Sequence, residues 1–388
     1  MTPEPICIVG LGAVSAAGSD CRATLARFRT GTRTAGPPTV FATEVDKPVF
    51  EVRDLAPDPA AMRTAVLLFR AVEEALADAG LSDDPASLRM GVCLGTTVAC
   101  QLNDMEFYRQ FRASGSAPMD AVDRYLQGNV SAAVARRYGF SGPTATIVNA
   151  CSSGADAIGM ALTWLRADLC DAVIAGGADE LNRVPMAGFN ALGIMSRTPC
   201  APFDANRQGL SLGEGAGVMA LESRASAQRR GVAANLMCAG YGTAGDAYHL
   251  TAPREDGSGL EAAIGQALDD AGATAADLAF VNAHGTATAT NDRVEGAVLA
   301  RVAGTACPVC STKGFTGHTL GAAGGLEAVF TALGLREQWI PATAGFVTPD
   351  EAIPLVPTRT VTPVEGACAL SASLAFGGNN SALILRRS

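Results

Sequence analysis

Three short segments, far apart in the chain, carry residues that could together perform thioester chemistry. Cys151 lies in the run Asn-Ala-Cys-Ser-Ser-Gly, His284 lies in Asn-Ala-His-Gly-Thr, and Lys313 and His318 bound the run Lys-Gly-Phe-Thr-Gly-His. A cysteine thiolate is a strong nucleophile, and imidazoles can transfer protons or donate hydrogen bonds to a developing oxyanion. The chain has three histidines, and two of them fall in these segments. The combination predicts an enzyme that forms and attacks a thioester.

The expected surroundings of these residues indicate how they would react. A strand over residues 146–148 leads directly to Cys151, which should open a helix of small residues. Unpaired N–H groups at a helix N-terminus favour a thiolate, so we expect a lowered pKa for Cys151. His318 should open the helix 320–333, where the same potential would lower its pKa and keep the imidazole neutral. His284 should project from the end of the strand 278–281.

Lys313 precedes His318 by five residues in a glycine-rich loop. It could orient a histidine or pair with an acid, and a solvated surface lysine is the alternative. The candidate acids are Asp292, Glu295 and Glu327.

The elements that must position these residues occur twice along the chain. The opening run 8–12 resembles 238–242, and helices expected over 62–80 and 260–272 both end in Ala-Gly before a strand. We therefore expect two halves, 1–235 carrying Cys151 and 236–388 carrying both histidines. The first half has additional residues at about 99–145, which could cap a pocket or form an interface. Alternating strands and helices predict parallel-rich sheets covered by helices, with both sets of strand ends meeting at one crevice.

Composition excludes several classes of function. The 388 residues are 48% hydrophobic and 17% charged, which is typical of a compact globular protein. A formal net charge of −9 argues against nucleic acid and anionic membranes as partners. The sequence has no signal-peptide pattern and no apolar run long enough to span a bilayer, so we expect a cytoplasmic protein with its 11 cysteines reduced. We expect no metal site.

These motifs resemble those of the β-ketoacyl-carrier-protein synthases, in particular the elongating Cys-His-His type of the thiolase superfamily. The resemblance runs from the strand 8–12 to the run Phe-Gly-Gly-Asn-Asn that begins at Phe376. It implies the thiolase fold, an α/β arrangement of two duplicated halves in five layers, αβαβα. It also implies fatty acid, polyketide or polyene synthesis by decarboxylative Claisen condensation, without a redox cofactor or metal.

The same resemblance implies roles for the site residues. Cys151 would take an acyl chain from an acyl carrier protein, and His284 and His318 would bind the malonyl thioester carbonyl and assist its decarboxylation. The N–H groups of Cys151 and Phe376 would form the oxyanion hole, and Phe376 would also gate the pocket. The remaining implied residues support these: Lys313 with Asp292 and Glu327 would hold the histidines and the local charge, and Thr286 and Thr288 would contact the phosphopantetheine arm.

Other readings stay open. Thiolases carry a second cysteine where this chain has Phe376, and initiating synthases carry asparagine where it has His318, so both comparisons favour an elongating enzyme. A subunit resembling a chain-length factor, which supports an active partner, usually lacks the nucleophile that Cys151 provides. The chain could also be the active half of a heterodimer or form a homodimer. Departures from the family pattern at Ala375 and Asn379, and a loop 286–290 without proline, bear on substrate choice.

Two further expectations concern the partner and the substrate. Carrier proteins are acidic, so we expect a basic docking patch, for which Arg63, Arg109 and Arg112 are candidates. Pocket depth should depend on Phe189, Met195 and the segment 99–145, but neither chain length nor pathway follows from the sequence.

Overall fold

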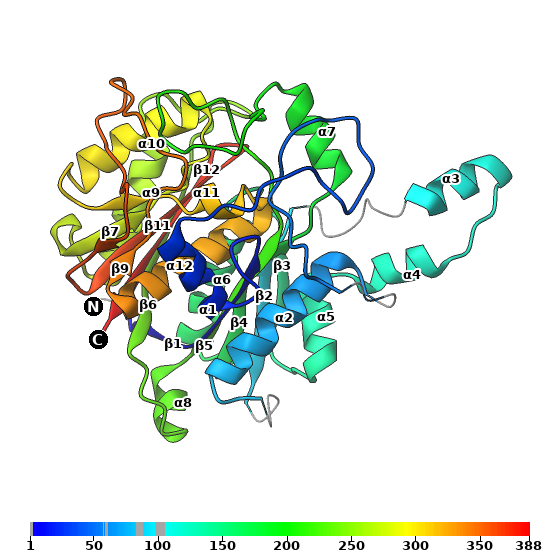
Figure 1. Ribbon diagram of the computed structural model, residues 1–388. Coiled ribbons are helices and arrows are strands. Elements are labelled where there is room, and N and C mark those ends of the chain that lie inside the picture. The colour runs from blue at the N-terminus through cyan, green and yellow to red at the C-terminus, as the bar shows by residue number, and fades with distance from the viewer. Residues whose placement is uncertain (1–2, 57, 59–60, 83–87, 98–104) are drawn as a thin grey trace.

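The computed structural model describes residues 3–56, 58, 61–82, 88–97 and 105–388 (Figure 1). Within these residues the main sheet has ten strands in the order β3-β2-β4-β5-β1-β6-β12-β11-β7-β8. The strands are β1 (Ile6–Ser15), β2 (Met90–Gly95), β3 (Thr144–Ile147), β4 (Ala172–Asp179), β5 (Gly215–Glu222), β6 (Leu236–Gly245), β7 (Leu278–Asn282), β8 (Val309–Cys310), β11 (Cys368–Ala375) and β12 (Asn379–Arg387). A separate pair consists of β9 (Trp339–Ile340) and β10 (Thr362–Pro363).

The sheet shows the duplication directly. If the strands of the first half are numbered by their order in the chain, they lie across the sheet as third, second, fourth, fifth and first, counted from the edge at β3. The strands of the second half lie in the same order, counted from the opposite edge at β8. The halves join where β1 and β6 pair antiparallel over three residues of each strand. In each half the three outer strands are parallel, as expected, but the inner strands are antiparallel. The prediction of a parallel-rich sheet is wrong for these inner strands, because β12, for example, returns directly from β11 through a tight turn instead of a helical crossover.

Helices cover the sheet in layers. α2 (Arg63–Asp78) and α5 (Val130–Tyr138) pack on the outer face of the first half, and α9 (Ser258–Ala271) and α10 (Ala289–Val302) on that of the second. α6 (Ser153–Arg166) and α12 (Ala323–Glu337) lie between the two halves in a shared apolar core. Two outer helical layers, two half-sheets and one central helical layer make the five-layer thiolase-like fold.

Glycines on the opening strands explain how closely the outer helices approach. A Cβ at Gly12 of β1 would lie 1.9 Å from the carbonyl oxygen of Ala71 in α2. At Gly242 of β6 it would lie 2.1 Å from the carbonyl oxygen of Ala263 in α9. The matching contacts show that the similar runs 8–12 and 238–242 perform the same packing task in each half.

The two central helices cross at another set of glycines. A Cβ at Gly154 of α6 would lie 2.6 Å from the backbone nitrogen of Gly325 in α12, and one at Gly324 would lie 2.6 Å from the nitrogen of Ala155. Side chains would separate these helices, so the glycines bring the helix N-terminal ends together. Almost all of α12 is buried, as expected of a helix between two sheets.

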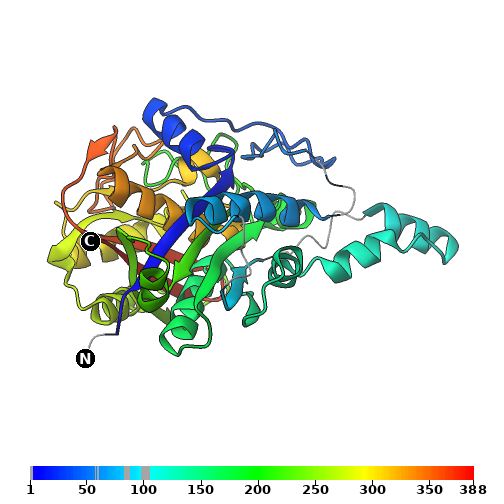
Figure 2. The ribbon, with the colours of Figure 1, turned by 90° about the horizontal axis from the view of Figure 1, so that it is seen from below.

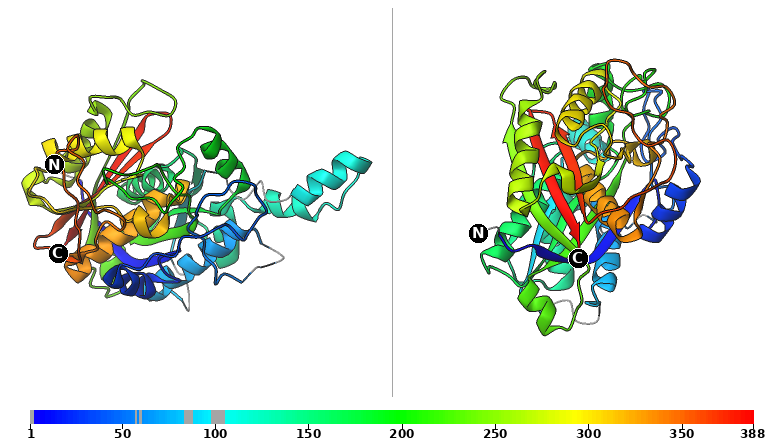
Figure 3. Two further views of the ribbon diagram at one scale, coloured as in Figure 1. Left: turned by 45° about the horizontal axis from the view of Figure 1, so that its top comes forward. Right: turned by 90° about the vertical axis from the view of Figure 1, so that its left-hand side faces the viewer.

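The remaining α-helices are α1 (Cys21–Thr30), α3 (Met105–Ser114), α4 (Asp120–Gln127), α7 (Arg183–Ala191), α8 (Arg224–Arg229) and the short α11 (Lys313–Thr316). Of these, α11 is buried beside the central layer, and the others lie toward the outside of the fold. α3 and α4 extend from the body as an arm (Figures 2 and 3). Within the described ranges, no helix is long and apolar enough to cross a membrane.

Candidate active site

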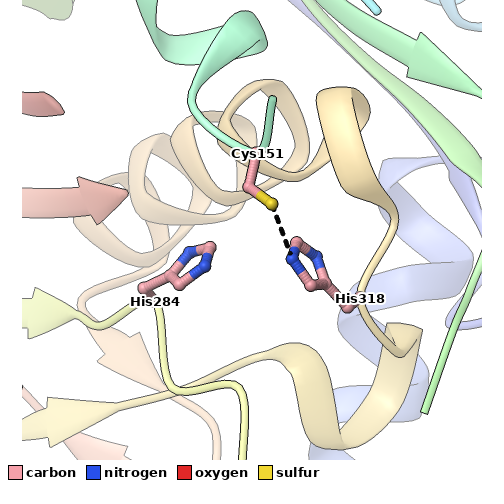
Figure 4. Close-up of side chains that lie close together, drawn as sticks. All are labelled: Cys151, His284 and His318. Atoms are coloured by element: carbon pink, nitrogen blue, oxygen red, sulfur yellow. Dashed lines mark hydrogen bonds between the residues drawn. The ribbon is translucent and has the colours of Figure 1, made fainter. Parts of the chain in front are cut away.

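The three residues singled out by chemistry meet between the two halves (Figure 4). Cys151 lies between β3 and α6, and His318 lies between α11 and the short 3-10 helix (Leu320–Ala322) that leads into α12. His284 follows β7 by two residues. Because α6 and α12 occupy equivalent places and touch through glycine, Cys151 and His318 approach each other from equivalent helix ends, as the repeat predicted.

Strained turns present these side chains to the cavity. Ala150 has φ 48°, and Leu320, two residues after His318, has φ 54°. Residues with a Cβ rarely adopt this left-handed conformation, which persists only where the surrounding structure enforces it. Ala287, in the loop after His284, has φ 67°. The chain therefore stores backbone strain beside all three functional residues.

The reacting atoms are close and shielded from water. The Nε2 atom of His318 lies 3.1 Å from the Sγ atom of Cys151, and one ligand atom from each of Cys151, His284 and His318 falls within 4.8 Å of the others. The imidazole rings are 5.2 Å apart and nearly perpendicular. Cys151 is 6% exposed, His284 1% and His318 3%.

Hydrogen bonds to the far sides of the rings determine their tautomers. The backbone N–H of Leu320 donates to Nδ1 of His318 at 3.3 Å, so the ring proton of a neutral His318 resides on Nε2. The Lys313 ammonium donates to Nδ1 of His284 at 3.0 Å, with the same consequence for His284. Both imidazoles can therefore offer an Nε2–H to a group bound beside the sulfur.

Lys313 is a structural cation rather than a surface residue. It is 1% exposed, and its ammonium also donates to the carbonyl oxygen of His284 at 2.6 Å and to the Glu327 carboxylate. The other Glu327 oxygen, Oε2, lies 4.0 Å from Nδ1 of His284. Lys313 and Glu327 thus form one network with His284.

The other two candidate acids act on the backbone. Glu295 accepts the N–H groups of His284 at 2.6 Å and Gly285 at 2.8 Å. Asp292 accepts those of Phe203 at 2.7 Å and Ala287 at 3.1 Å. Burial raises the pKa of both carboxyl groups, that of Glu295 to about 8.

Asp292 makes no hydrogen bond or ion pair with Lys313 among the described residues, so its predicted role together with Lys313 and Glu327 is not seen as a direct contact. Its nearest cation is instead Arg207, whose Nε lies 3.8 Å from the carboxylate. The α10 helix places Asp292 against the loop after His284, where its carboxylate accepts the Ala287 N–H.

Burial overrides the helix-end effect predicted for the thiol. Desolvation raises the pKa of Cys151 to about 11, although the Lys313 charge and a hydrogen bond from the Phe376 N–H oppose the rise. The prediction of a lowered cysteine pKa is therefore wrong. The prediction of a neutral His318 is confirmed, because burial and then Lys313 hold its pKa well below the usual range. Burial, Lys313 and His318 do the same for His284.

A cavity of about 290 Å³ opens onto the reacting atoms. Thr286 and Thr288 line it, their hydroxyls 2.9 Å apart. Phe189 and Phe376 also line it, with ring centroids 5.5 Å apart. The remaining apolar lining residues are Ile194, Leu210, Ala252, Pro253, Ala289, Leu374 and Ala375. The remaining polar ones are Asp246, Thr251, Thr290, Asn291 and Asn380.

Two pocket expectations did not match this lining. Met195 is buried in a small apolar cluster and does not line the cavity. None of the lining residues comes from 105–145, while residues 99–104 of that segment lie outside the described residues. Sequence reasoning missed Asp246, which accepts the Asn380 amide at 2.8 Å. The sequence feature that could have led to Asp246 is its partner Asn380, the last residue of the run Phe-Gly-Gly-Asn-Asn.

The candidate docking arginines have different surroundings. Arg63 forms two hydrogen bonds to the buried Glu214 carboxylate, the longer at 2.8 Å, and a third to the carbonyl of Val52 at 2.8 Å. It is thus a structural residue, and its assignment to docking is wrong. Arg109 and Arg112 lie exposed on α3, where Arg109 pairs with Glu106 at 2.8 Å.

A thiol and two imidazoles are also ligand types that Zn²⁺ prefers. Here the Lys313 ammonium lies 3.0 Å from His284, and its charge opposes the binding of a divalent cation. The arrangement therefore favours nucleophilic chemistry over metal binding.

Comparison with known proteins agrees with this geometry. Residues 35–227 match the family model of the β-ketoacyl synthase N-terminal domain, and residues 236–347 that of its C-terminal domain. The chain is 33% identical to the 3-oxoacyl-[acyl-carrier-protein] synthase 2 of Staphylococcus aureus (strain N315), over 98% of both chains. It is similar to the solved ishigamide ketosynthase/chain length factor, with 31% identity, a TM-score of 0.93 and complete coverage of both chains. It is also similar to the ketosynthase ApeO in complex with its chain length factor ApeC from Xenorhabdus doucetiae, with 29% identity, a TM-score of 0.88 and coverage of 99% and 98%. With its Cys-His-His site in a thiolase-like fold, this chain belongs to the β-ketoacyl synthase family.

Proposed function

We infer that this chain is a 3-oxoacyl-[acyl-carrier-protein] synthase, an acyltransferase that condenses an acyl chain with malonyl carrier protein. The observation that carries this is the buried Cys151 sulfur facing two neutral imidazoles that each present an Nε2–H. A single nucleophile beside two hydrogen-bond donors suits a reaction with a covalent thioester and a separate enolate.

The first step transfers the acyl chain to the enzyme. The Cys151 thiolate attacks the carbonyl carbon of the carrier thioester, and the N–H groups of Cys151 and Phe376 donate hydrogen bonds to the oxygen on which negative charge develops. The bond to the phosphopantetheine sulfur then breaks, and that sulfur takes up the proton that Cys151 released. The Phe376 N–H lies near enough to the Cys151 sulfur to oppose the rise in the pKa of the thiol, which supports this assignment.

The second step makes the new carbon–carbon bond. The Nε2–H groups of His284 and His318 donate to the thioester oxygen of the malonyl unit while its carboxylate leaves as CO2. The resulting enolate carbon attacks the acyl–Cys151 carbonyl, and the carbon–sulfur bond breaks. The Cys151 thiolate then takes up one proton from solvent, which balances the negative charge left by the malonyl carboxylate. A neutral imidazole suits this role because it keeps its N–H available at physiological pH.

The surrounding residues support these steps. Lys313 with Glu327 holds His284 in the productive tautomer, while Glu295 fixes its backbone. The Thr286 and Thr288 hydroxyls at the cavity wall would contact the phosphopantetheine arm, and Phe376 would move to admit the acyl chain past Phe189.

A second ketosynthase-like chain is the proposed structural partner. β3 is an edge strand of the sheet, and Val148 just after it is 67% exposed. Such an edge favours pairing with another chain. The α3–α4 arm adds exposed Tyr108, Phe111 and Leu126. The partner would be either a second copy or a chain resembling a chain-length factor, the kind of partner found with the ketosynthases in two of the similar structures.

The alternative is that this chain itself supports an active partner as such a factor. The intact Cys151, His284 and His318 favour the catalytic half of any heterodimer instead. We further propose a division at residues 235/236, carrier docking through Arg109 and Arg112, and the cytoplasm as the location, where the thiol stays reduced.

The test is intact-protein mass after incubation with an acyl carrier protein thioester. The wild-type chain should gain one acyl group, and Cys151→Ala should gain none. Adding malonyl carrier protein should then remove the acyl group and release CO2. An unmodified wild-type chain, or an adduct that persists in Cys151→Ala, would contradict the proposal. Native mass spectrometry of the chain alone distinguishes a homodimer from a subunit that needs a different partner.

A further inference from the structure

We propose that Asp156 is a positioning residue that holds the Cys151 turn in place from both halves of the molecule. The inference rests on the proposed function, because it concerns the residue that would accept the acyl chain. Asp156 lies in the first turn of α6, five residues after Cys151.

One oxygen of the carboxylate holds the residues on either side of the turn. Oδ2 accepts the Asn149 side-chain amide at 2.5 Å and the Ser152 hydroxyl at 2.9 Å. Asn149 and Ser152 bracket Ala150 and Cys151, so a single carboxylate closes the turn that carries the nucleophile.

The other oxygen reaches the second half of the chain. Oδ1 accepts the Tyr241 hydroxyl of β6 at 2.8 Å and the Ser381 hydroxyl of β12. The Tyr241 ring packs against Gly159, which lies one turn along α6 from Asp156. A Cβ at Gly159 would lie only 2.5 Å from the ring. Glycine at that position thus lets the tyrosine reach the carboxylate.

The turn needs this support because its backbone is strained. Ala150 has φ 48°, and the backbone N–H groups of Ser152 and Ser153 make long bonds of 3.3 Å. The Ser153 hydroxyl also spans the turn, accepting the Asn149 N–H at 2.8 Å and donating to the Ala150 carbonyl at 2.6 Å, but it does not reach the second half of the chain in the described contacts. A left-handed alanine persists only when neighbouring groups enforce it. The Asp156 carboxylate accepts four charge-assisted hydrogen bonds, each stronger than a neutral one.

Losing the carboxylate should affect the two half-reactions differently. A relaxed turn would move the Cys151 sulfur away from the Phe376 N–H and from His318, so acyl transfer should slow. His284 and His318 are held by Lys313, Glu295 and the Leu320 N–H, none of which touches Asp156 among the described contacts. Release of CO2 from malonyl carrier protein should therefore change little.

The experiment compares Asp156→Asn, Tyr241→Phe and Ser381→Ala with wild type. Ser373→Ala is the matched control, because Ser373 lies opposite Ser381 on β11 and its buried hydroxyl has no hydrogen-bond partner in the described part of the chain. Three quantities are measured: the rate of acyl addition by intact mass, CO2 release from malonyl carrier protein without acyl donor, and Cys151 alkylation by iodoacetamide.

Misplacement of a reacting group by about 1 Å costs on the order of 100-fold, so Asp156→Asn should slow acyl addition by about 10- to 100-fold. Tyr241→Phe and Ser381→Ala should each slow it less, and neither should slow it further in the Asp156→Asn background. CO2 release should stay within about threefold of wild type, and Ser373→Ala should match wild type in all three measurements.

Two results from the carrier-protein assays would overturn the inference. One is acyl addition at the wild-type rate in Asp156→Asn. The other is a parallel fall in acyl addition and CO2 release, which would mean a general structural role. If wild type itself gains no acyl group, the proposed function fails instead. The alkylation assay uses no carrier protein, so it tests the position of Cys151 even if acyl transfer is not observed. A wild-type alkylation rate in Asp156→Asn would contradict the positioning role.

Discussion

Replacing Lys313 by methionine should expose the cost of the buried charge beside His284. The ammonium is the one Lys or Arg group within 4.0 Å of Glu327 among the described residues, and Glu327 Oε2 already lacks a hydrogen-bond partner there. Methionine matches the length of the lysine stem but carries no charge. The substitution therefore leaves a buried carboxylate unpaired.

The size of the effect follows from two general quantities. Removing one partner of a buried ion pair costs roughly 3–5 kcal/mol. Unfolding entropy is about 2.1 cal/mol/K per residue, so in a 388-residue chain this loss lowers the melting temperature by roughly 4–6 °C.

The loss should also depend on pH. Burial raises the pKa of Glu327 to about 7 even with Lys313 opposing the rise, and without Lys313 it should be higher still. A carboxyl group whose pKa is raised on folding contributes most to folding stability below its unfolded pKa of about 4.3. That contribution is lost as pH rises through the folded pKa. In wild type this loss is complete just above pH 7. In Lys313→Met the folding stability continues to fall above pH 7, by up to about 1.4 kcal/mol per pH unit.

Thermal unfolding at pH 6, 7 and 8.5 measures both effects. The difference between Lys313→Met and wild type should widen with pH. Adding Glu327→Leu should restore most of the melting temperature and remove the pH dependence, because exchanging both charges for apolar groups is often neutral. Lys47→Met is the control, since Lys47 is the only other lysine and is partly exposed. A gap that stays constant with pH, or a double variant less stable than Lys313→Met, would refute the reasoning.

Three further predictions follow from the site and the packing. Because the pKa of Cys151 is raised to about 11, the rate of its alkylation by iodoacetamide should rise about tenfold per pH unit from 7 to 9, and a plateau by pH 7 would contradict this. Gly12→Ala should destabilise the fold by several kcal/mol, on the order of an overpacked core, because its Cβ would overlap the Ala71 carbonyl. Gly265→Ala, in α9 with open space around its Cβ, should instead stabilise by roughly 0.5–1 kcal/mol in the same urea-unfolding series. Chelation with EDTA should leave condensation activity unchanged, and a loss that Zn²⁺ restores would show that the three ligands hold a metal.

The sequence was informative wherever local pattern and function coincide. The meeting of Cys151, His284 and His318 could be predicted from three short motifs and from the repeat, because equivalent helix ends must come together in a duplicated fold. The neutral state of His318 was also predictable. Its cause was not, since burial and Lys313, rather than the helix end alone, set the pKa.

Errors arose where the outcome depends on contacts distant in sequence. The pKa of Cys151 depends on how completely the two halves enclose it, and no local pattern reports that burial. Arg63 looked available for a partner, yet Glu214, 151 residues away, takes its guanidinium. Asp292 carries the right charge for the Lys313 network, but its carboxylate accepts the backbone N–H groups of Phe203 and Ala287 instead.

The glycine crossing of α6 and α12 has a consequence for how such a site can diversify. Gly154 and Gly325 bring two main chains together without intervening side chains, so the spacing of the helix ends that carry Cys151 and His318 is set by backbone contact. The cavity wall near them, at Phe189, Ile194 and Leu210, belongs to other segments. Mutation can therefore reshape the wall for new acyl chains while the reactive geometry is inherited unchanged, which separates the evolution of substrate range from that of catalysis.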